Sequence, residues 1–290
     1  MPSTRPVALI TGASSGIGKY IALAMAVKGW RIIGTGRDKD RIASTQEALD
    51  RVAPETQSEL LTVNLSLLSD AAALADAVQQ RTDRLDVLVN NAGGMTDRLE
   101  LTSEGLEANF AVNHLGPFLL THRLLPLMRA TARNHTPSIP RILFTSSDAS
   151  EMLPALDLDD LQGIAGFDPG KAYCTGKLAN VLFARELADR LTDEAICVHA
   201  VHPGAVDTNF YAYVPEGTRQ RTKDLPKRSG PDGADTLVWL ATTDAGAHNS
   251  GSYWYERATR PPNPLVDDPE VRARFWEESE RLIASVSGNK

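Results

Sequence analysis

Two side chains in the second half of the chain have the types and spacing that proton transfer requires. Tyr173 and Lys177 lie four residues apart in a strongly helical segment, 172–191, so they share one face of a helix. An unperturbed tyrosine has a pKa of about 10, too high for a base near neutral pH. A neighbouring ammonium favours the phenolate and lowers that pKa, so this tyrosine could exchange a proton with a carbonyl or alcohol oxygen. Because such a pair is common by chance, the prediction depends on what surrounds it.

A pair of serines stands upstream of the tyrosine. The apolar run 141–147 predicts a buried strand that ends in Ser146 and Ser147, and this topology can place Ser147 beside Tyr173. The stretch between them, 148–170, is long for a structureless segment of a compact domain, and such loops are often functional.

A glycine-rich turn near the start of the chain has the features of a dinucleotide site. It follows the apolar run 7–10 and opens the helix-forming stretch 19–26. Glycine lets backbone N–H groups approach a ligand closely, and the unpaired N–H groups and dipole of a helix start attract a pyrophosphate. The turn residues predicted to bind the cofactor are Gly12, Ser14, Ser15, Gly16, Ile17 and Gly18. A tight turn without a ligand is the alternative, which the position between strand and helix disfavours.

The end of the second predicted strand, 30–35, bears on the choice of cofactor. An acidic side chain here accepts hydrogen bonds from the adenosine ribose of NAD, whereas an arginine accommodates the 2′-phosphate of NADP. Gly36 occupies the place of the acid and Arg37 follows it, so we expect NADP(H) to be preferred, with NAD(H) possible. Asp38 weakens the preference if it points into the same pocket, and an exposed Arg37 without a ligand is the alternative.

Two further strand ends carry polar or small residues. The third predicted strand, 59–65, ends in Asn64 and Leu65, where the asparagine meets an adenine edge or caps the strand. Ser69 is expected to cap the alanine-rich helix 70–80 that follows. The fourth strand, 85–93, ends in an asparagine pair followed by small residues, in which Asn91 can tie neighbouring strand ends together while Ala92 and Gly93 leave room for a ribose.

A polar residue lies inside the long helical region 104–133. Asn113 stands in mid-helix, where a buried amide must find partners, and a local kink with a water would satisfy it. His114 is adjacent but faces elsewhere, so we interpret it as structural.

Together these ordered motifs resemble the short-chain dehydrogenase/reductase family over nearly the whole chain. The stretch 172–191 and the following His202-Pro203-Gly204 look most like its retinol-dehydrogenase-related branch. The resemblance implies that Tyr173 is the general acid or base, that Ser147 holds the carbonyl oxygen, and that Lys177 also binds the nicotinamide ribose. It implies that Asn113 positions a water, that hydride moves to or from NADP(H), and that no metal is required. The remaining residues of the predicted cofactor site are Pro203, Gly204, Val206 and Thr208.

Strands alternate with helices throughout, which predicts an α/β fold. We expect one doubly wound parallel sheet of the Rossmann type with helices on both faces. The whole chain, 1–290, is expected to form a single dinucleotide-binding catalytic domain. The polar stretch 205–230 is a candidate substrate lid, and 261–290 forms a C-terminal extension with a helix. Aromatic side chains in these two segments either line a pocket for a lipophilic carbonyl or serve ordinary packing. They are Phe210, Tyr211, Tyr213, Phe275 and Trp276.

Charge and cysteine content limit the kinds of binding partner and cellular location that we expect. The formal net charge of −7 argues against binding to nucleic acid or to an anionic membrane surface. The two cysteines are too few for a disulfide framework, so we expect reduced thiols and a cytoplasmic location. No signal peptide or membrane anchor is expected. Several apolar residues of two late helices exceed one core-facing stripe, which predicts a homodimer or homotetramer; they are Val181, Leu182, Phe183, Leu237, Val238 and Trp239.

The leading hypothesis is an NADPH-dependent carbonyl reductase, or the reverse alcohol dehydrogenase, acting on a small-molecule carbonyl or alcohol. A dinucleotide-binding sensor or scaffold without catalysis is the main alternative on the same fold. A dehydratase or epimerase that uses bound cofactor is the third, and it would show no net cofactor turnover.

Overall fold

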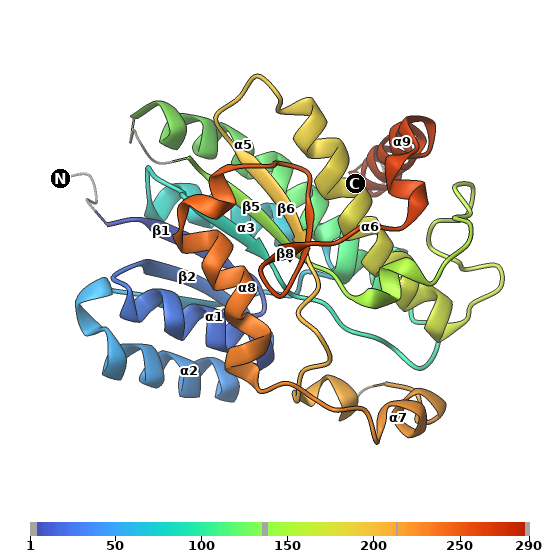
Figure 1. Cartoon of the computed structure of the whole chain (residues 1–290), viewed down its shortest axis with the longest axis horizontal. Coiled ribbons are helices and arrows are strands. Elements are labelled where there is room, and N and C mark those ends of the chain that lie inside the picture. The colour runs from blue at the N-terminus through green and yellow to red at the C-terminus, as the bar shows by residue number, and fades with distance from the viewer. Residues whose placement is uncertain (1–4, 135–138, 213, 288–290) are drawn as a thin grey trace.

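The computed structural model describes residues 5–134, 139–212 and 214–287. In this part of the chain one eight-stranded sheet has the order β3-β2-β1-β4-β5-β6-β7-β8 (Figure 1). All neighbouring strands are parallel except β7 and β8, so the expected doubly wound fold is confirmed with one antiparallel edge strand added. The strands are β1 (Val7–Ile10), β2 (Arg31–Gly36), β3 (Glu59–Thr62), β4 (Val87–Asn90), β5 (Arg141–Thr145), β6 (Cys197–Val201), β7 (Tyr253–Tyr255) and β8 (Ala258–Thr259).

The central strands are short apolar runs because both of their faces are covered. Every residue of β1 and β4 is buried, which is the pattern of parallel strands packed between two layers of helices. Leu9 of β1 pairs with Ile33 of β2 on one side and with Leu88 of β4 on the other. The in-register pairing brings the carboxyl ends of these strands to one edge of the sheet, where ligands bind in open α/β sheets.

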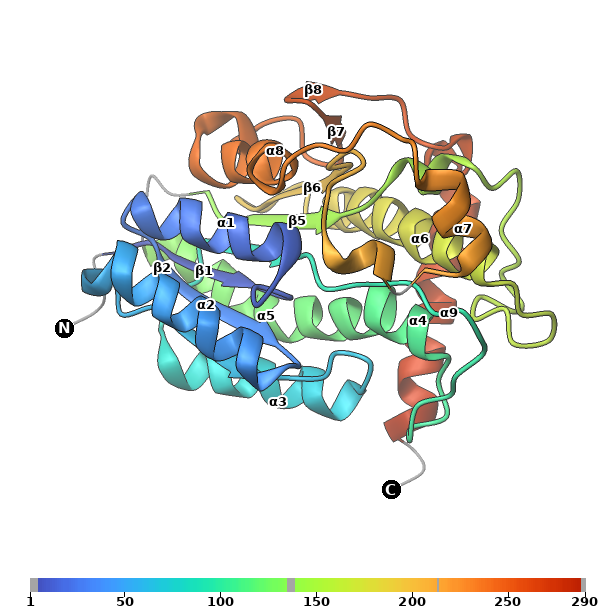
Figure 2. The same cartoon turned by 90° about the horizontal axis from the view of Figure 1, so that it is seen from below.

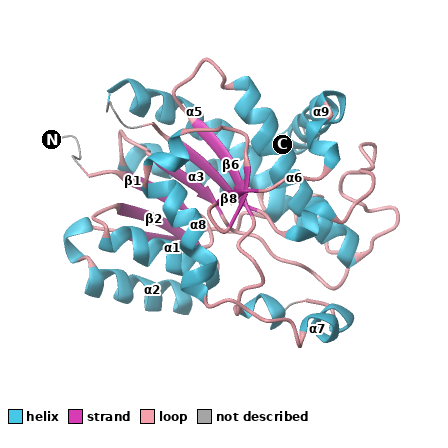
Figure 3. Cartoon of the chain, in the orientation of Figure 1, coloured by secondary structure: helices cyan, strands magenta, loops and turns pink. Residues whose placement is uncertain are grey.

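Helices cover the two faces of the sheet (Figures 1 and 3). One face carries α1 (Gly16–Val27), α2 (Lys39–Val52) and α8 (Gly230–Thr242), whose apolar residues form one buried cluster. The other face carries α3 (Leu68–Arg81), α5 (Gly116–Asn134) and α6 (Pro169–Arg190), with α9 (Pro269–Ser287) packed outside α6 (Figure 2). The short helices α4 (Ala108–Phe110) and α7 (Glu216–Thr222) lie in the segments beyond the strand ends.

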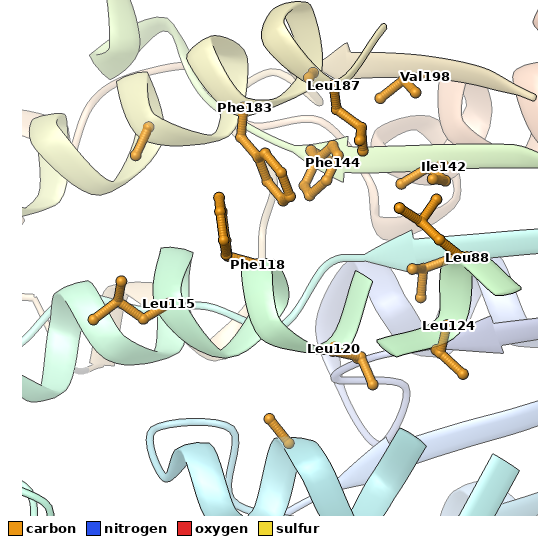
Figure 4. Close-up of a cluster of buried hydrophobic side chains, with 14 of the residues drawn as sticks. Leu88, Leu115, Phe118, Leu120, Leu124, Ile142, Phe144, Phe183, Leu187 and Val198 are labelled. Carbon is orange, nitrogen blue, oxygen red and sulfur yellow. The ribbon is translucent and has the colours of Figure 1, made fainter. Parts of the chain in front are cut away.

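Aromatic rings fill the space between the sheet, α5 and α6 (Figure 4). Phe118 of α5 stacks on Phe183 of α6 with ring centroids 4.6 Å apart, and Phe144 of β5 lies 5.0 Å from Phe183. This core holds α6, and therefore Tyr173 and Lys177 on it, in a fixed position relative to the sheet.

Helix α9 completes that core. Phe275 is fully buried, and Trp276 lies against Phe118 and Phe183 with the guanidinium of Arg190 stacked 4.0 Å from its ring centroid. Of the two interpretations of these aromatic residues, packing is therefore the one that the structure supports.

The apolar residues that predicted self-association are largely used within one chain. Five of the six are buried, at 9 % exposure or less, and Trp239 lies 5.6 Å from Trp254 by ring centroids. Part of the apolar surface of α6 is buried because α9 packs against it. The excess of apolar residues is thus explained without a second subunit, and assembly stays a prediction.

Candidate active site

The glycine turn between β1 and α1 has the backbone geometry that the sequence predicted. Gly12 and Gly16 have φ angles of +68° and +52°, a region that favours glycine, and a Cβ on Gly18 would lie 2.3 Å from the Gly12 carbonyl oxygen. Ser15 occupies the N-cap position of α1 but makes no side-chain cap hydrogen bond. The first N–H groups of the helix therefore face the turn without that cap, as a pyrophosphate site requires.

The asparagine at the end of β4 ties three strand ends together. Asn91 donates its side-chain amide to the Thr11 carbonyl oxygen (3.0 Å) and accepts from the Thr145 hydroxyl (3.3 Å). The Thr11 hydroxyl also accepts from the backbone N–H of Asn91 and of Ala92, at 2.9 Å each. The predicted role of Asn91 between strands is confirmed, and it fixes the turn that carries Ala92 and Gly93.

The end of β2 explains why no acid stands at position 36. A Cβ on Gly36 would lie 2.3 Å from the Ser14 hydroxyl oxygen and 3.0 Å from Ile42, so only glycine fits beside the glycine turn. Asp38 is engaged as the N-cap of α2, where its carboxylate accepts from the N–H groups of Asp40 and Arg41. Arg37 is exposed, and the described residues show no ion pair for it.

The third strand end is partly committed to its own turn. The Asn64 side-chain oxygen accepts from the backbone and hydroxyl of Ser66, and its backbone N–H donates to Asp70. Leu65 is buried, and its carbonyl oxygen would lie 2.2 Å from a Cβ on Gly116. Asn64 therefore caps its turn, one of the two roles that the sequence left open.

The segment after β6 returns to the glycine turn. Gly204 has a φ of +84°. Val206 is buried against α8, where a Cβ on Gly233 would come within 2.5 Å of the Val206 side chain. Thr208 lies at the start of α1, 3.5 Å from where a Cβ on Gly16 would be. Backbone pairing of 205–207 with Arg228 closes the base of the candidate lid. Tyr213 lies outside the described residues.

Asn113 lies in a π-helix, Ala111–Leu115, that joins α4 to α5. Its amide nitrogen donates to the carbonyl oxygen of Gly94 (2.9 Å) and to Asn109, while its side-chain oxygen is buried without a partner in the described residues. A Cβ on Gly93 would lie 2.4 Å from that oxygen and 3.2 Å from the Lys177 Nζ. The expected kink is thus a π-helix, and Gly93 leaves space between Asn113 and Lys177.

His114, the next residue, is structural as expected. It is fully buried among phenylalanine rings, and its Nε2 is 2.8 Å from the Ser279 hydroxyl of α9. Burial lowers the pKa of His114 to about 3, so the ring is neutral near pH 7.

Lys177 is buried, at 6 % exposure, with its ammonium aimed at the end of β5. Its Nζ donates to the Thr145 carbonyl oxygen (3.2 Å), and the same oxygen also accepts from the Asn180 side chain (3.1 Å). The Lys177 Nζ lies 5.6 Å from the Tyr173 ring centroid. Burial lowers the pKa of Lys177 to about 8.

The two serines after β5 have different partners. The Ser146 hydroxyl is buried and donates to the Lys177 carbonyl oxygen at 2.7 Å, which attaches α6 to the strand. The Ser147 hydroxyl is partly exposed, donates to the Asp148 carboxylate at 2.8 Å, and also makes a hydrogen bond with Tyr173. This arrangement supports Ser147 over Ser146 as the hydroxyl beside the tyrosine.

Tyr173 does not have the lowered pKa that the sequence suggested for the pair. Burial raises its pKa, the Ser147 hydrogen bond opposes this, and the nearby Asp148 charge adds to the rise. Phe210 of the lid covers it, with ring centroids 5.3 Å apart. In the chain alone Tyr173 is therefore protonated near neutral pH.

Comparison with known proteins identifies this arrangement. A model of the short chain dehydrogenase family matches residues 6–218. The chain belongs to the short-chain dehydrogenase/reductase family. Retinol dehydrogenase 12 of Bos taurus is 38% identical over 282 residues, covering 96% of this chain and 86% of that protein. A candidate daunorubicin C-13 ketoreductase, DnrU, of Streptomyces sp. strain C5 is 35% identical over 280 residues, covering 96% of this chain and 93% of that protein.

Solved structures of the short-chain dehydrogenase/reductase family agree with this fold. A crystal structure of a protein from Mycobacterium paratuberculosis has a TM-score of 0.72 and 30% identity, covering 97% of this chain and 95% of that one. The NADP complex of Pseudomonas aeruginosa RhlG has a TM-score of 0.68 and 28% identity, covering 87% and 94%. The similarity to retinol dehydrogenases 12, 13 and 14 places the chain in the retinol-dehydrogenase-related branch.

Two other kinds of feature are absent from the described residues. No helix there is long and apolar enough to cross a membrane. No group of three or more histidine, cysteine or acidic side chains in that part of the chain is arranged to hold a metal ion. Cys174 and Cys197 are free thiols.

Sequence reasoning missed three residues of this reductase-like site. Thr145 and Asn180 fix the end of α6 around Lys177, and Asp148 bonds to Ser147. Asp148 directly follows the serine pair, and this position in the sequence is the signal that could have identified it.

Proposed function

We propose that this short-chain dehydrogenase/reductase is an NADP(H)-dependent oxidoreductase that transfers a hydride between nicotinamide and a carbonyl or alcohol, with Tyr173 as general acid or base. The observation that carries the proposal is the convergence of Asn113, Ser147, Tyr173 and Lys177 beside the glycine turn, at the carboxyl edge of the sheet.

The chain's own residues divide the work. Ser147 holds the substrate carbonyl oxygen, and Tyr173 donates a proton to that oxygen or takes one from the alcohol. Lys177 lies beneath the tyrosine ring and binds a ribose, while Asn113 and Gly93 hold a water between Lys177 and solvent. A bound nicotinamide supplies or accepts the hydride.

The protonation state of Tyr173 suits the role of proton donor in reduction. Its pKa is raised by burial, so the ring carries the proton that a carbonyl oxygen must receive. Oxidation requires the phenolate, which the Lys177 ammonium and a positively charged nicotinamide ring would favour.

The geometry of the predicted cofactor residues supports dinucleotide binding. The N–H groups at the start of α1 would hold the pyrophosphate, Asn91, Ala92 and Gly93 would flank a ribose, and Arg37 would meet the 2′-phosphate. Because Asp38 is engaged as a helix cap, it does not compete for that phosphate, which supports a preference for NADP(H) over NAD(H).

The substrate is proposed to be a lipophilic ketone or aldehyde. Phe210 of the lid lies against Tyr173, with ring centroids 5.3 Å apart, and Tyr211 lies against Phe210 at 5.4 Å. The name of the Streptomyces relative, a candidate ketoreductase, agrees with a carbonyl substrate.

The decisive test follows the absorbance of reduced nicotinamide with a panel of ketones and aldehydes. Tyr173→Phe removes one hydroxyl, so the enzyme should still fold and bind NADPH while turnover falls by roughly 10²–10⁴. Tyr20→Phe, an exposed tyrosine of α1, is the matched control and should keep normal turnover. Near-normal turnover by Tyr173→Phe overturns the assignment.

The same assay separates the alternatives. A sensor or scaffold would bind NADPH without oxidising it on any substrate. A dehydratase or epimerase would convert its substrate with no net change in nicotinamide absorbance.

Three broader predictions accompany the proposal. We expect one catalytic domain over 1–290 and a cytoplasmic location. We also expect a homodimer or homotetramer, and a concentration-independent monomer mass in light scattering contradicts that assembly.

A further inference from the structure

An acidic side chain stands at the point where the proposed carbonyl would bind. Asp148 is exposed, and its carboxylate accepts the hydrogen bond of the Ser147 hydroxyl at 2.8 Å. Its charge is close enough to Tyr173, Cys174 and Tyr211 to raise the pKa of all three. A negative charge therefore faces the substrate side of the site.

This carboxylate makes no ion pair among the described residues, although its charge contributes to the raised pKa of Arg260. In the part of the chain that the structure describes, no basic side chain lies within ion-pair distance of Asp148. Arg260 is bonded to Glu151 at 2.6 Å, and Lys227 lies over the Tyr211 ring, 4.3 Å from its centroid. His202 accepts the backbone N–H of Asp148 on its Nδ1, and burial lowers the pKa of that ring.

Substrate binding must break the one side-chain hydrogen bond that Asp148 makes in the described part of the chain. A serine hydroxyl has a single proton to donate, and Ser147 now gives it to Asp148. When Ser147 donates to a carbonyl oxygen, the carboxylate loses this partner, and Tyr211 of the lid is close enough for its pKa to be raised by the charge. A carboxylate beside aromatic rings is a combination that attracts cations.

We propose that Asp148 determines specificity by binding a positively charged group next to the carbonyl of the substrate, so that the preferred class is ammonium-bearing ketones. The inference rests on the proposed reductase function, because it uses the exchange of the Ser147 hydrogen bond. The substrate cation replaces the serine proton as the partner of Asp148.

The test compares two ketones of equal shape and different charge. Phenacyltrimethylammonium carries a quaternary nitrogen where phenyl neopentyl ketone carries a carbon. For the unaltered enzyme with NADPH, kcat/KM should be higher for the cationic ketone. In Asp148→Asn the ratio of kcat/KM for the cationic ketone to kcat/KM for the neutral ketone should fall by about tenfold, mostly through the KM of the cationic ketone.

The control removes the same charge elsewhere. Asp193, exposed after α6 at the far end of that helix, changes to asparagine without altering the ratio of the two ketones. If Asp148→Asn and Asp193→Asn leave the same ratio as the unaltered enzyme, the proposal is overturned, although the enzyme remains a reductase.

A binding measurement keeps the test independent of turnover. Calorimetry gives the Kd of each ketone for the unaltered protein and for Asp148→Asn. A selective loss of affinity for the cationic ketone in Asp148→Asn supports the inference, even if neither ketone is reduced. The failure to reduce either ketone would count only against the proposed reductase function. Equal affinity changes for both ketones overturn it.

Discussion

Removal of Arg37 should alter the discrimination between two cofactors that differ by one phosphate. Arg37 is exposed beside the glycine turn, and the neighbouring Asp38 is engaged as the N-cap of α2. Gly36 cannot accept an acidic side chain, since a Cβ there would lie 2.3 Å from the Ser14 hydroxyl oxygen. Arg37→Ala therefore removes the guanidinium without rebuilding the turn.

The size of the effect follows from the hydrogen bonds that the guanidinium can make. A bidentate contact with a phosphate contains two charge-assisted bonds, each contributing roughly 1.5–3 kcal/mol when well shielded. Because Arg37 is exposed, solvent and salt reduce the combined contribution of the two bonds to about that of one weak bond, about 1.5 kcal/mol or roughly tenfold in affinity. NADH has no phosphate at this position, so its affinity should stay within about twofold.

The assay measures Kd for NADPH and NADH by fluorescence titration and KM by turnover, at low and high salt. Arg51→Ala serves as the control, because it removes an exposed arginine from the last turn of α2, the helix that follows Arg37. The loss for NADPH should shrink at high salt, where screening weakens the contact. Equal losses for both cofactors, or none, would refute the reasoning and leave Arg37 as a surface residue.

Three further predictions concern buried groups. Burial lowers the pKa of Lys177 from 10.5 to about 8, so between pH 8 and pH 10.5 the unfolded chain binds more protons than the folded protein. In this pH range the free energy of unfolding of the ligand-free protein should rise with pH by up to about 1.4 kcal/mol per pH unit relative to that of Lys177→Met. Urea unfolding of both proteins measures this difference. Burial lowers the pKa of His114 to about 3 and of His199 to about 4, so stability should fall as pH drops from 6.5 toward 4, and His114→Gln should reduce that slope in the same unfolding experiment. Trp276→Ala should cost about 3–5 kcal/mol in the free energy of unfolding, because it empties the contact of α9 with α6, and a loss below about 1 kcal/mol would contradict this packing role.

The sequence alone predicted those elements and site residues whose structure depends on near neighbours in the chain. A fully buried parallel strand must be apolar along its whole length, so 7–10 and 87–90 were recognisable from composition alone. The glycine turn and Asn91 were predictable for a related reason, because their chemistry depends on neighbours within one turn. The grouping of Ser147, Tyr173 and Lys177 followed from strand order.

Features set by distant partners were not predictable. Ser69 was expected to cap α3, but the helix begins at Leu68, and Glu104 accepts from the N–H groups of both residues across 35 positions of sequence. The hairpin to β8 was missed because Glu256 and Arg257 adopt positive φ angles of 49° and 59°, a conformation usually signalled by asparagine or glycine.

The raised pKa of Tyr173 belongs with these non-local effects. The helix spacing suggested that Lys177 would lower it, but burial is the largest cause of the shift, and Phe210, from a segment far along the chain, lies against the ring. The spacing of Tyr173 and Lys177 on one helix could not predict how far tertiary packing shields the tyrosine from solvent.

The π-helix around Asn113 makes the number of residues in this segment as constrained as their identity. A π-turn closes hydrogen bonds from residue i to i+5, one residue more than an α-turn, and each α-helical residue rotates the chain by about 100°. Deleting one residue from 111–115 would restore a regular helix and swing the preceding turn round the axis by about that angle. That turn includes Glu107, whose carboxylate caps α4 by accepting from the N–H groups of Asn109 and Phe110. Single-residue insertions and deletions should therefore be tolerated far less well here than substitutions, which makes the segment a fixed-length element for any effort to graft or recombine this site.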